Sequence, residues 1–426
     1  MLEIQLKYGK SEISYEIPEK NLWEIVKAKS EQEGVENPQH EIGSAIQKPI
    51  GSPRLTKIIK PSSKIVITQD DHTRGTPGYY ILPPLLNSLN VCGVPDENIT
   101  VIFACGIHRA VKPEEQKALV GEEVLSRVIC VSHNCDAIDF VKLGMTSRKT
   151  PVEINALAAE ADHIIATGKC EYHYYAGFSG GRKSVFPGIA SRTGINKNHA
   201  FLIDARAVTG NLAGNPVHED MVEAAKMTKT PFIVNIVQNT QQNLIKAFAG
   251  DLVLAHLAAV QFYDAFYRVR VKSQAPDIVL VGAGYPKDID LYQAHKAIDN
   301  AQRIVRPGGV IVSALECAEG VGNPVFLEWA KKYRTYEQVE AQIKTRFEMG
   351  GHKAYYLAKA LQKAKIILVS KMNPKMVKEI FRMEPAKTVE EAMELAYSLV
   401  GRTAKVTFMP DGTITLPTLP SKKVKV

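Results

Sequence analysis

The sequence predicts an α/β fold of two domains, each with a mainly parallel sheet flanked by helices. Short β-branched runs alternate with longer amphipathic stretches along the chain, which is typical of parallel sheets covered by helices on both faces. A chain of 426 residues also has room for two domains with full cores.

The expected strands are short apolar runs bounded by glycine, proline or charged residues. They are Ile65–Gln69, Ile99–Cys105, Val128–Ser132, His163–Thr167, Phe232–Val237, Ile278–Val281, Val310–Ala314 and Ile366–Val369.

Two helices have recognisable starts. Pro113–Leu119 opens with proline in the first turn, and Leu252–Tyr267 follows Asp251, a plausible cap. Because Arg268–Pro276 follows the long helix and precedes a new strand, we place a domain boundary there. The expected domains are 1–270, joined by 405–426, and 271–404.

The C-terminal stretch Lys405–Pro417 alternates around Asp411-Gly412. Asp-Gly between alternating apolar residues is a hairpin signal, so we expect a hairpin that packs back on the first domain.

The composition favours a cytoplasmic protein without nucleic-acid or membrane partners. The six cysteines form no CxxC pair, the N-terminus lacks the apolar core of a secretory signal, and no apolar stretch of about 18 residues occurs. The formal charge of +8 is not concentrated in a basic stripe with aromatics. A basic protein of this kind is compatible with a small anionic substrate.

Polar or glycine-rich segments follow four expected strands directly. They are Asp70–Arg74, Gly106–Arg109, Gly168–His173 and Gly282–Gly284. Because the carboxyl ends of parallel strands share one edge of a sheet, these residues are expected in one ligand site. The alternative is that they are ordinary polar loops.

His108 and His173 are candidate acid–base residues, since histidine exchanges protons near neutral pH. Two histidines on opposite sides of a stereocentre suit a reaction that runs in both directions. Each of them, taken alone, can equally be a hydrogen-bonded structural histidine.

The segment Tyr172–His199 combines glycines, aromatics and cations. Glycine allows close approach of the backbone to a phosphate, and the hydroxyl and cations favour an anion. The residues concerned are Gly177, Ser179, Gly180, Gly181, Arg182 and Lys183. Arg182 separates Gly181 from Lys183, so this is not a Walker loop. A flexible surface loop is the alternative.

Two other function classes stay open. The turn Gly282–Gly284 follows a strand, as in a conventional NAD-type dehydrogenase, but lacks the third glycine of the dinucleotide fingerprint. A non-catalytic protein that binds an anion or a cofactor would show the same cationic loop.

Five motifs in one order resemble those of the nickel-dependent lactate racemase family, over nearly the whole chain. They are DDHTRGTP at Asp70–Pro77, GIHR at Gly106–Arg109, YHYYAGFSGGRKSVFPGIA at Tyr172–Ala190, NKNHA at Asn196–Ala200 and YQAHK at Tyr292–Lys296. Five motifs in order are far more specific than any one of them.

The resemblance implies nickel and a nickel-pincer pyridinium-3,5-bisthiocarboxylic acid mononucleotide. Lys183 is similar to the lysine that carries this group through a thioamide, and His199 to the single protein ligand of the nickel. The other expected cofactor contacts are Asp71, Thr73, Tyr172, Gly177, Ser179, Gly180, Gly181 and Arg182.

The resemblance also implies a racemase or epimerase of a small 2-hydroxy acid. His108 and His173 are similar to paired acid–base histidines, which exchange the hydroxyl proton while hydride passes to the cofactor and back. The expected substrate-binding residues are Arg74, Tyr292, Gln293 and Lys296. A closed, dry site protects such an intermediate, so we expect the active site in the cleft between the domains.

The segment Gly350–Lys353 departs from the lactate enzymes, which by resemblance have a bulky apolar residue near the substrate methyl. His352 or Lys353 can recognise a more polar side chain there, or the segment is a loop before a helix Ala354–Lys363. The physiological 2-hydroxy acid and a homo-oligomeric state stay open, and cofactor-biosynthesis enzymes are expected partners.

Overall fold

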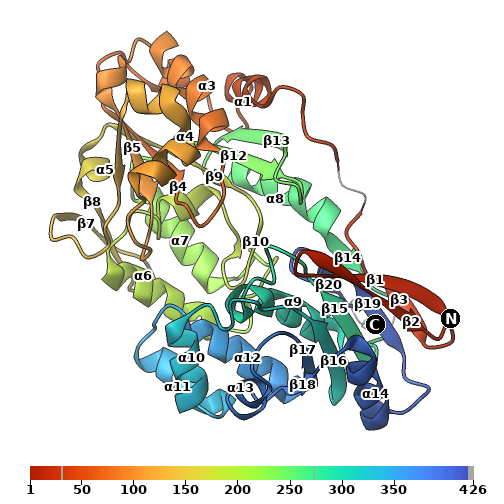
Figure 1. Cartoon of the computed structure of the whole chain (residues 1–426). Coiled ribbons are helices and arrows are strands. Elements are labelled where there is room, and N and C mark those ends of the chain that lie inside the picture. The colour runs from red at the N-terminus through yellow and green to blue at the C-terminus, as the bar shows by residue number, and fades with distance from the viewer. Residues whose placement is uncertain (30–31, 273, 421–426) are drawn as a thin grey trace, which may run out of the picture. The chain divides into compact units, whose positions relative to one another are not determined.

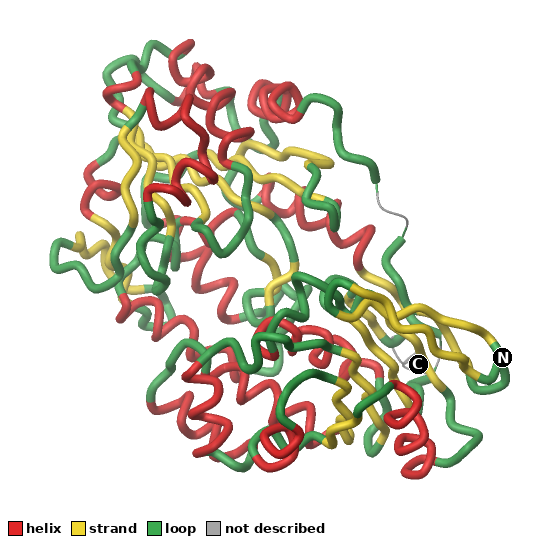
Figure 2. The backbone as a smooth tube through the Cα atoms, in the orientation of Figure 1, coloured by secondary structure: helices red, strands yellow, loops and turns green. Residues whose placement is uncertain are grey.

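The structure, a computed structural model, describes residues 1–29, 32–272 and 274–420. It divides into two compact units (Figures 1 and 2). We call Glu31–Ala265 the central unit, and Met1–Ser30 with Phe266–Val426 the terminal unit, because the latter holds both ends of the chain.

The central unit is built on a six-stranded sheet, and all of its strands except Leu244–Gly250 were expected from the sequence. The strands are β4 (Ile65–Asp70), β5 (Ile99–Ala104), β6 (Ile129–Ser132), β9 (His163–Lys169), β12 (Phe232–Gln238) and β13 (Leu244–Gly250). Their order is β13-β12-β9-β4-β5-β6, and only the pair β12–β13 is antiparallel. The carboxyl ends of β4, β5, β9 and β12 therefore share one edge.

Helices cover this sheet. They are α1 (Pro38–Gln47), α2 (Leu55–Ile58), α3 (Gly78–Val91), α4 (Pro113–Arg127), α5 (Ala156–Glu160), α6 (Arg192–His199), α7 (Pro216–Lys226) and α8 (Leu254–Tyr267), whose last residues belong to the terminal unit. Helices α1, α3 and α4 share a core with β4, β5 and β12, and α7 and α8 lie below the sheet in Figure 1.

Local sequence signals explain several of these helix starts. Asparagine followed by proline caps α1 and α7, through the side chains of Asn37 and Asn215. The Asp251 carboxylate accepts the N–H groups of Val253 and Leu254, so the cap predicted for the long helix is confirmed.

Smaller elements complete the central unit. They are the antiparallel pair β7 (Phe140–Met145) and β8 (Pro151–Asn155), the antiparallel pair β10 (Tyr172–His173) and β11 (Gly177–Phe178), and the 3₁₀ turns η1 (Asp96–Asn98), η2 (Gly181–Ser184) and η3 (Ala200–Ile203).

The terminal unit has a second six-stranded sheet, in which every neighbouring pair is parallel. Its strands are β3 (Leu22–Ile25), β15 (Ile278–Gly282), β16 (Gly309–Ala314), β17 (Ala364–Val369), β18 (Glu384–Ala386) and β19 (Val406–Met409), in the order β18-β17-β16-β15-β19-β3. Two smaller pairs are β1 (Leu2–Tyr8) with β2 (Ser11–Ile17), and β14 (Arg268–Arg270) with β20 (Leu416–Thr418).

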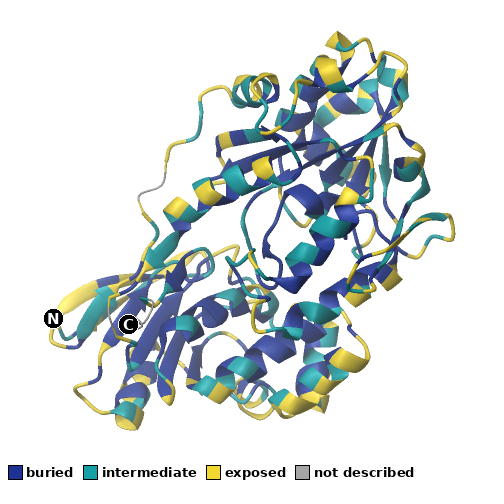
Figure 3. Ribbon diagram, turned by 180° about the vertical axis from the view of Figure 1, so that it is seen from behind, coloured by how far each residue is buried: buried dark blue, intermediate teal, exposed yellow. Residues whose placement is uncertain are grey.

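Helices cover this sheet as well. They are α9 (Leu291–Ile304), α10 (Pro324–Lys332), α11 (Tyr336–Thr345), α12 (Gly351–Lys363), α13 (Pro374–Glu379) and α14 (Val389–Val400). The hairpin β1–β2 and α14 share one apolar core with the sheet, and α9 and α12 contact the same strands. The inner strands of both sheets are buried between their cover layers (Figure 3).

The predicted fold class is confirmed: each unit has a parallel-rich sheet flanked by helices. In the ranges 1–29, 32–272 and 274–420, no helix has both the length and the apolar character needed to span a membrane.

The domain limits differ from our expectation. The division falls between Ala265 and Phe266, and Met1–Ser30 groups with the terminal unit. The expected linker Arg268–Pro276 contains a strand, β14, which pairs with β20.

The predicted C-terminal hairpin is wrong. β19 is parallel to β15 on one side and to β3 on the other, and β20 pairs with β14 instead of β19. Val406 and Phe408 are thereby buried in the terminal core. The reason is that β19 fills the edge of β15, so residues 405–420 belong with the terminal unit, together with residues 1–29 and apart from the central unit.

Candidate active site

The end of β4 carries two adjacent carboxylates with separate partners. Asp70 accepts from Thr76 Oγ1 at 2.6 Å and from the Lys169 N–H at 3.1 Å. Burial raises the pKa of Asp70 in spite of these bonds. Asp70 thus links the loop after β4 to the end of β9.

Asp71 orients the first candidate acid–base residue. Its Oδ2 lies 2.6 Å from His108 Nδ1, and its Oδ1 accepts from Thr73 Oγ1 at 2.6 Å. Burial acts to raise the pKa of Asp71, but the bonds from His108 and Thr73 and the charge of Arg74 lower it to about 2. The carboxylate is therefore ionised at neutral pH and must accept, so His108 Nδ1 carries a proton and Nε2 is the atom left for proton exchange.

Arg74 remains charged in this setting. Burial acts to lower its pKa, but the carboxylates of Asp71 and Asp70 raise it above the ordinary value. A guanidinium held charged beside the sheet edge is suited to bind a carboxylate through two N–H groups.

Lys183 lies in the same electrostatic environment. Burial lowers its pKa well below the ordinary value, and the charges of Arg74 and Arg182 lower it further, against Asp70 and Asp71. A lowered pKa enlarges the unprotonated fraction of this amine, and the unprotonated amine is the nucleophilic form.

This amine is expected to react with acetic anhydride at a lower pH in folded apo-protein than in urea-unfolded protein. Acylation follows the deprotonated fraction, and a lowered pKa enlarges that fraction at neutral pH. In the unfolded chain the same lysine should require a pH near its ordinary value of 10.5. Peptide mass spectrometry across a pH series measures both curves, and coincident curves would contradict a depressed pKa.

The Arg182 side chain forms hydrogen bonds within the loop that carries Lys183. It is 0 % exposed and donates from Nη1 to the Gly180 carbonyl at 3.0 Å and from Nη2 to the carbonyls of Ala176 and Phe178 at 2.9 and 2.8 Å. Burial lowers its pKa to about 9. Its guanidinium thus holds the loop together, a role that the sequence did not indicate.

Ser179 and two of the glycines also have partners within the protein. Ser179 Oγ donates to the Lys169 carbonyl at 2.6 Å. A Cβ on Gly177, whose φ is 78°, would lie 2.2 Å from the Asn211 carbonyl oxygen, and one on Gly180, also at φ 78°, would lie 2.9 Å from Asn235 Oδ1. Glycine is required here by the turn and by close packing of protein atoms.

An aromatic cluster brings two further candidates together. The Tyr175 ring lies edge-to-face with His173 at 4.7 Å between centroids and with His199 at 5.1 Å. Tyr172 donates from its hydroxyl to Asp264 at 2.9 Å, so its position is fixed by α8. The sequence had not singled out Tyr175, which packs between the two histidines.

The other expected substrate residues lie in the terminal unit. Tyr292, Gln293 and Lys296 occupy the first turns of α9, after the cap Asp290. Lys353 Nζ lies 4.7 Å from the centre of the Tyr292 ring, and the His352 ring lies 6.0 Å from it. The expectation of a loop at Gly350–Lys353 is wrong, because α12 begins at Gly351 and buries both side chains.

The glycine turn after β15 is packed by the protein itself. A Cβ on Gly284 would lie 2.6 Å from the Lys7 side chain, and the Tyr285 N–H donates to the Gly9 carbonyl at 2.8 Å. The hairpin β1–β2 therefore covers the place where a dinucleotide-binding enzyme would need space.

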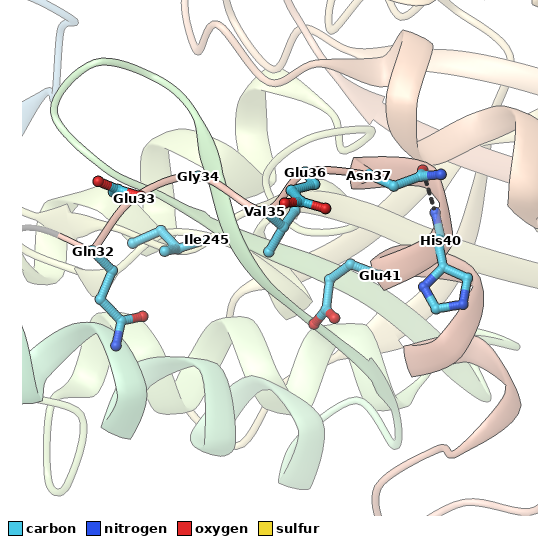
Figure 4. Close-up of a pocket in the computed structure, with 9 residues that line it drawn as sticks. All are labelled: Gln32, Glu33, Gly34, Val35, Glu36, Asn37, His40, Glu41 and Ile245. Atoms are coloured by element: carbon cyan, nitrogen blue, oxygen red, sulfur yellow. Dashed lines mark hydrogen bonds between the residues drawn. The ribbon is translucent and has the colours of Figure 1, made fainter.

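A surface hollow of the central unit lies outside this set of residues. It is lined by 32–37 and by the start of α1, where the Asn37 side chain accepts the His40 N–H (Figure 4). None of the expected cofactor or substrate residues lines it.

Comparison with known proteins identifies the family. Residues 8–210 match the lactate racemase N-terminal domain, and residues 271–416 match the lactate racemase C-terminal domain. Lactate racemases of Thermoanaerobacterium thermosaccharolyticum and Lactiplantibacillus plantarum are each 35% identical to this chain, over 97% of it and over 98% and 99% of their own lengths. The chain belongs to the lactate racemase family. It is thus an isomerase, a racemase, as the resemblance of its motifs had implied.

Solved structures agree with membership of the lactate racemase family. The lactate racemase apoprotein of Thermoanaerobacterium thermosaccharolyticum superposes with a TM-score of 0.90 at 34% identity, over 98% of this chain and 100% of that one. A Thermotoga maritima protein, 18% identical, matches with a TM-score of 0.64 over 91% of this chain and shares the fold.

Proposed function

We propose that this racemase inverts the stereocentre of a small 2-hydroxy acid with a nickel-pincer pyridinium-3,5-bisthiocarboxylic acid mononucleotide attached to Lys183. The observation that carries the proposal is the Lys183 amine. Burial and neighbouring cations lower its pKa, and Arg74 and Asp71 act on it from the loop after β4. Such an amine is suited to form the amide-type bond that a lysine-linked cofactor needs.

The side chains of the central unit fit this group. His199 would supply one imidazole nitrogen to nickel, a metal that imidazole suits. When bound, the cofactor supplies an acceptor and donor of hydride for the carbon that carries the hydroxyl. That hydrogen is too weakly acidic for a histidine to remove as a proton, so the protein alone would not complete the reaction.

The chain's own residues then handle the proton and the carboxylate. His108, oriented by Asp71, and His173 take the hydroxyl proton of opposite enantiomers and return it in the reverse direction. Arg74 binds the substrate carboxylate. We keep the assignment of Tyr292, Gln293 and Lys296 to substrate binding as part of the proposal.

Two substrate classes fit. The names of the relatives favour lactate. Lys353, a second buried lysine, lies beside the Tyr292 ring and favours a 2-hydroxy acid with an additional anionic group. Burial and then the charge of Lys296 lower its pKa, so an anionic group of the substrate would be needed to hold the lysine charged. The two classes differ in whether the substrate carries a second anionic group that Lys353 can bind.

The test uses cofactor-loaded enzyme with 2-deuterated lactate and 2-deuterated 2-hydroxysuccinate in ordinary water. We expect the inverted product to keep most of its deuterium, because hydride transfer does not exchange the label with solvent. Chiral chromatography with mass spectrometry measures both inversion and label. Extensive loss of deuterium would instead support a carbanion and would refute the hydride route.

A matched variant decides the substrate class in the same assay. If the acidic substrate is preferred because of Lys353, Lys353→Met should lower inversion of 2-hydroxysuccinate about 10- to 100-fold and leave lactate nearly unchanged. Equal losses on both acids would assign Lys353 to the structure of α12 alone.

The remaining expectations concern supply of the cofactor. We propose that the enzyme works in the cytoplasm and receives its cofactor from separate biosynthesis enzymes. A conventional NAD-type dehydrogenase is the weaker alternative, because the hairpin β1–β2 packs against its candidate glycine turn. It predicts activity on added NAD without nickel.

A further inference from the structure

His199 ends a continuous chain of buried hydrogen bonds. Its Nδ1 lies 3.1 Å from Asn198 Oδ1. Asn198 Nδ2 donates to Asp220 Oδ2 at 2.8 Å and to the Val217 carbonyl at 3.1 Å. Thr146 Oγ1 donates to Asp220 Oδ1 at 2.5 Å. The side chains of Thr146, Asn198, His199 and Asp220 are at most 4 % exposed, so water does not compete for these bonds.

The partners of Asn198 decide which way its amide points. A backbone carbonyl and a carboxylate only accept hydrogen bonds, so the atom that faces Val217 and Asp220 must be the NH₂ group. The amide oxygen therefore faces His199. Because that oxygen only accepts, His199 Nδ1 has to carry the proton.

We infer that Asp220 and Asn198 are positioning residues that fix the Nδ1–H tautomer of His199 and so direct the Nε2 lone pair to nickel. Neither residue touches the metal. Asp220 orients Asn198, and Asn198 in turn orients His199. The inference rests on the proposed role of His199 as nickel ligand.

The chemistry of metal-binding histidine supports this role. A histidine binds a metal through the nitrogen that lacks hydrogen, and its other nitrogen usually donates to an acceptor that fixes the ring and raises its basicity. Here the acceptor is neutral, but the carboxylate of Asp220 polarises it through the Asn198 amide. His108 has the simpler version of the arrangement, since its Nδ1 donates directly to Asp71.

The elements that meet at Asp220 explain why its carboxylate is suited to this task. Asn198 and His199 lie in the last turn of α6, Asp220 lies in α7, and Thr146 follows β7 directly. The Thr146 hydroxyl also accepts from the Thr150 N–H at 3.1 Å, which orients its own hydrogen toward Asp220. The network therefore has one consistent direction of donation.

The test reads the tautomer in apo-protein, where no nickel is needed. Protein labelled with ¹⁵N-histidine is studied by NMR at pH 8, and the His199 signals are assigned by their loss in His199→Gln. We expect wild-type His199 to show a protonated Nδ1 and an unprotonated Nε2. A wild-type ring with its proton on Nε2 would overturn the inference.

Variants separate positioning from folding. Asn198→Ala should move most His199 to the Nε2–H form. Asp220→Leu should move a smaller fraction, because the Val217 carbonyl still accepts from Asn198. Asp220→Asn should keep Nδ1–H, because its amide oxygen still accepts from Asn198. Thermal unfolding shows whether each variant folds. If Asp220→Leu does not fold, the tautomer of His199 in Asn198→Ala decides the test. Unchanged Nδ1–H in folded Asn198→Ala would refute the relay.

A second measurement on loaded protein connects the tautomer to nickel. Asn198→Ala should release nickel to a chelator about 10- to 100-fold faster than wild type. His199→Ala is the reference: if it releases nickel at the wild-type rate, the proposed ligand is wrong while the NMR result stands. If His199→Ala accelerates release and Asn198→Ala does not, the relay is wrong while the proposed function stands.

Discussion

Lys183→Ala, made together with the cofactor-biosynthesis enzymes, is expected to lack both the covalent mass increment and bound nickel. Its racemase activity should fall by at least roughly 10⁴-fold, because the protein supplies orientation and charge but no hydride acceptor. Intact mass, metal analysis and chiral assay measure the three quantities on one sample. Normal nickel content and activity in this variant would refute the attachment.

Two further variants show whether the bond or the charge of Lys183 matters. Lys183→Arg keeps a cation but cannot form the thioamide, so it should be as inactive as the alanine variant. Lys142→Ala removes a lysine whose side chain is 81 % exposed and should load and react as wild type. Activity in Lys183→Arg would mean that the lysine acts by charge alone.

Replacement of either acid–base histidine is expected to block interconversion in both directions, since each direction uses one histidine as base and the other as acid. His108→Ala and His173→Ala should each lower the rate about 10²- to 10⁴-fold. In a single turnover, each variant should still oxidise one enantiomer, and the two variants should retain opposite ones. Chiral analysis of consumed substrate measures this preference.

The Asp71–His108 bond allows a sharper version of that prediction. Asp71→Asn removes the carboxylate that holds His108 Nδ1–H, so it should share the enantiomer preference of His108→Ala with a smaller loss. His40→Ala, which removes an exposed histidine on α1, is the control and should leave the rate unchanged. Two histidine variants with the same enantiomer preference would contradict the opposed arrangement.

Much of the central sheet was predictable because its strands are buried on both faces. Such strands need apolar side chains at successive positions, which makes β4, β5 and β9 visible as continuous runs followed at once by polar residues. For Asp71 and His108, the sequence could predict only that both residues lie at the same edge of the sheet. The 2.6 Å contact between them depends on how two loops fold beyond their strands.

The roles of Arg182 and Ser179 were not predictable from composition. Near glycines, a cation and a hydroxyl resemble an anion site, yet Arg182 donates to carbonyls of its own loop and Ser179 to the Lys169 carbonyl at the end of β9. Asp220 gave no signal either, because its partner Asn198 lies 22 residues away on another helix. Of these residues, only Asn198 was indicated by the sequence, because it adjoins His199 in the NKNHA motif.

The sequence by itself determined the class of fold, the buried inner strands of both sheets and, through motifs in local segments, the family. These properties depend on which side chains stand next to one another in the chain. Tertiary structure alone decided that β19 lies between β15 and β3, where an Asp-Gly turn had suggested a hairpin. It also decided the hydrogen bonds that orient His108 and His199. Strand partners and buried hydrogen bonds depend on groups that are distant in the chain. Several of these groups are possible partners, and only the packing of the whole core selects one of them.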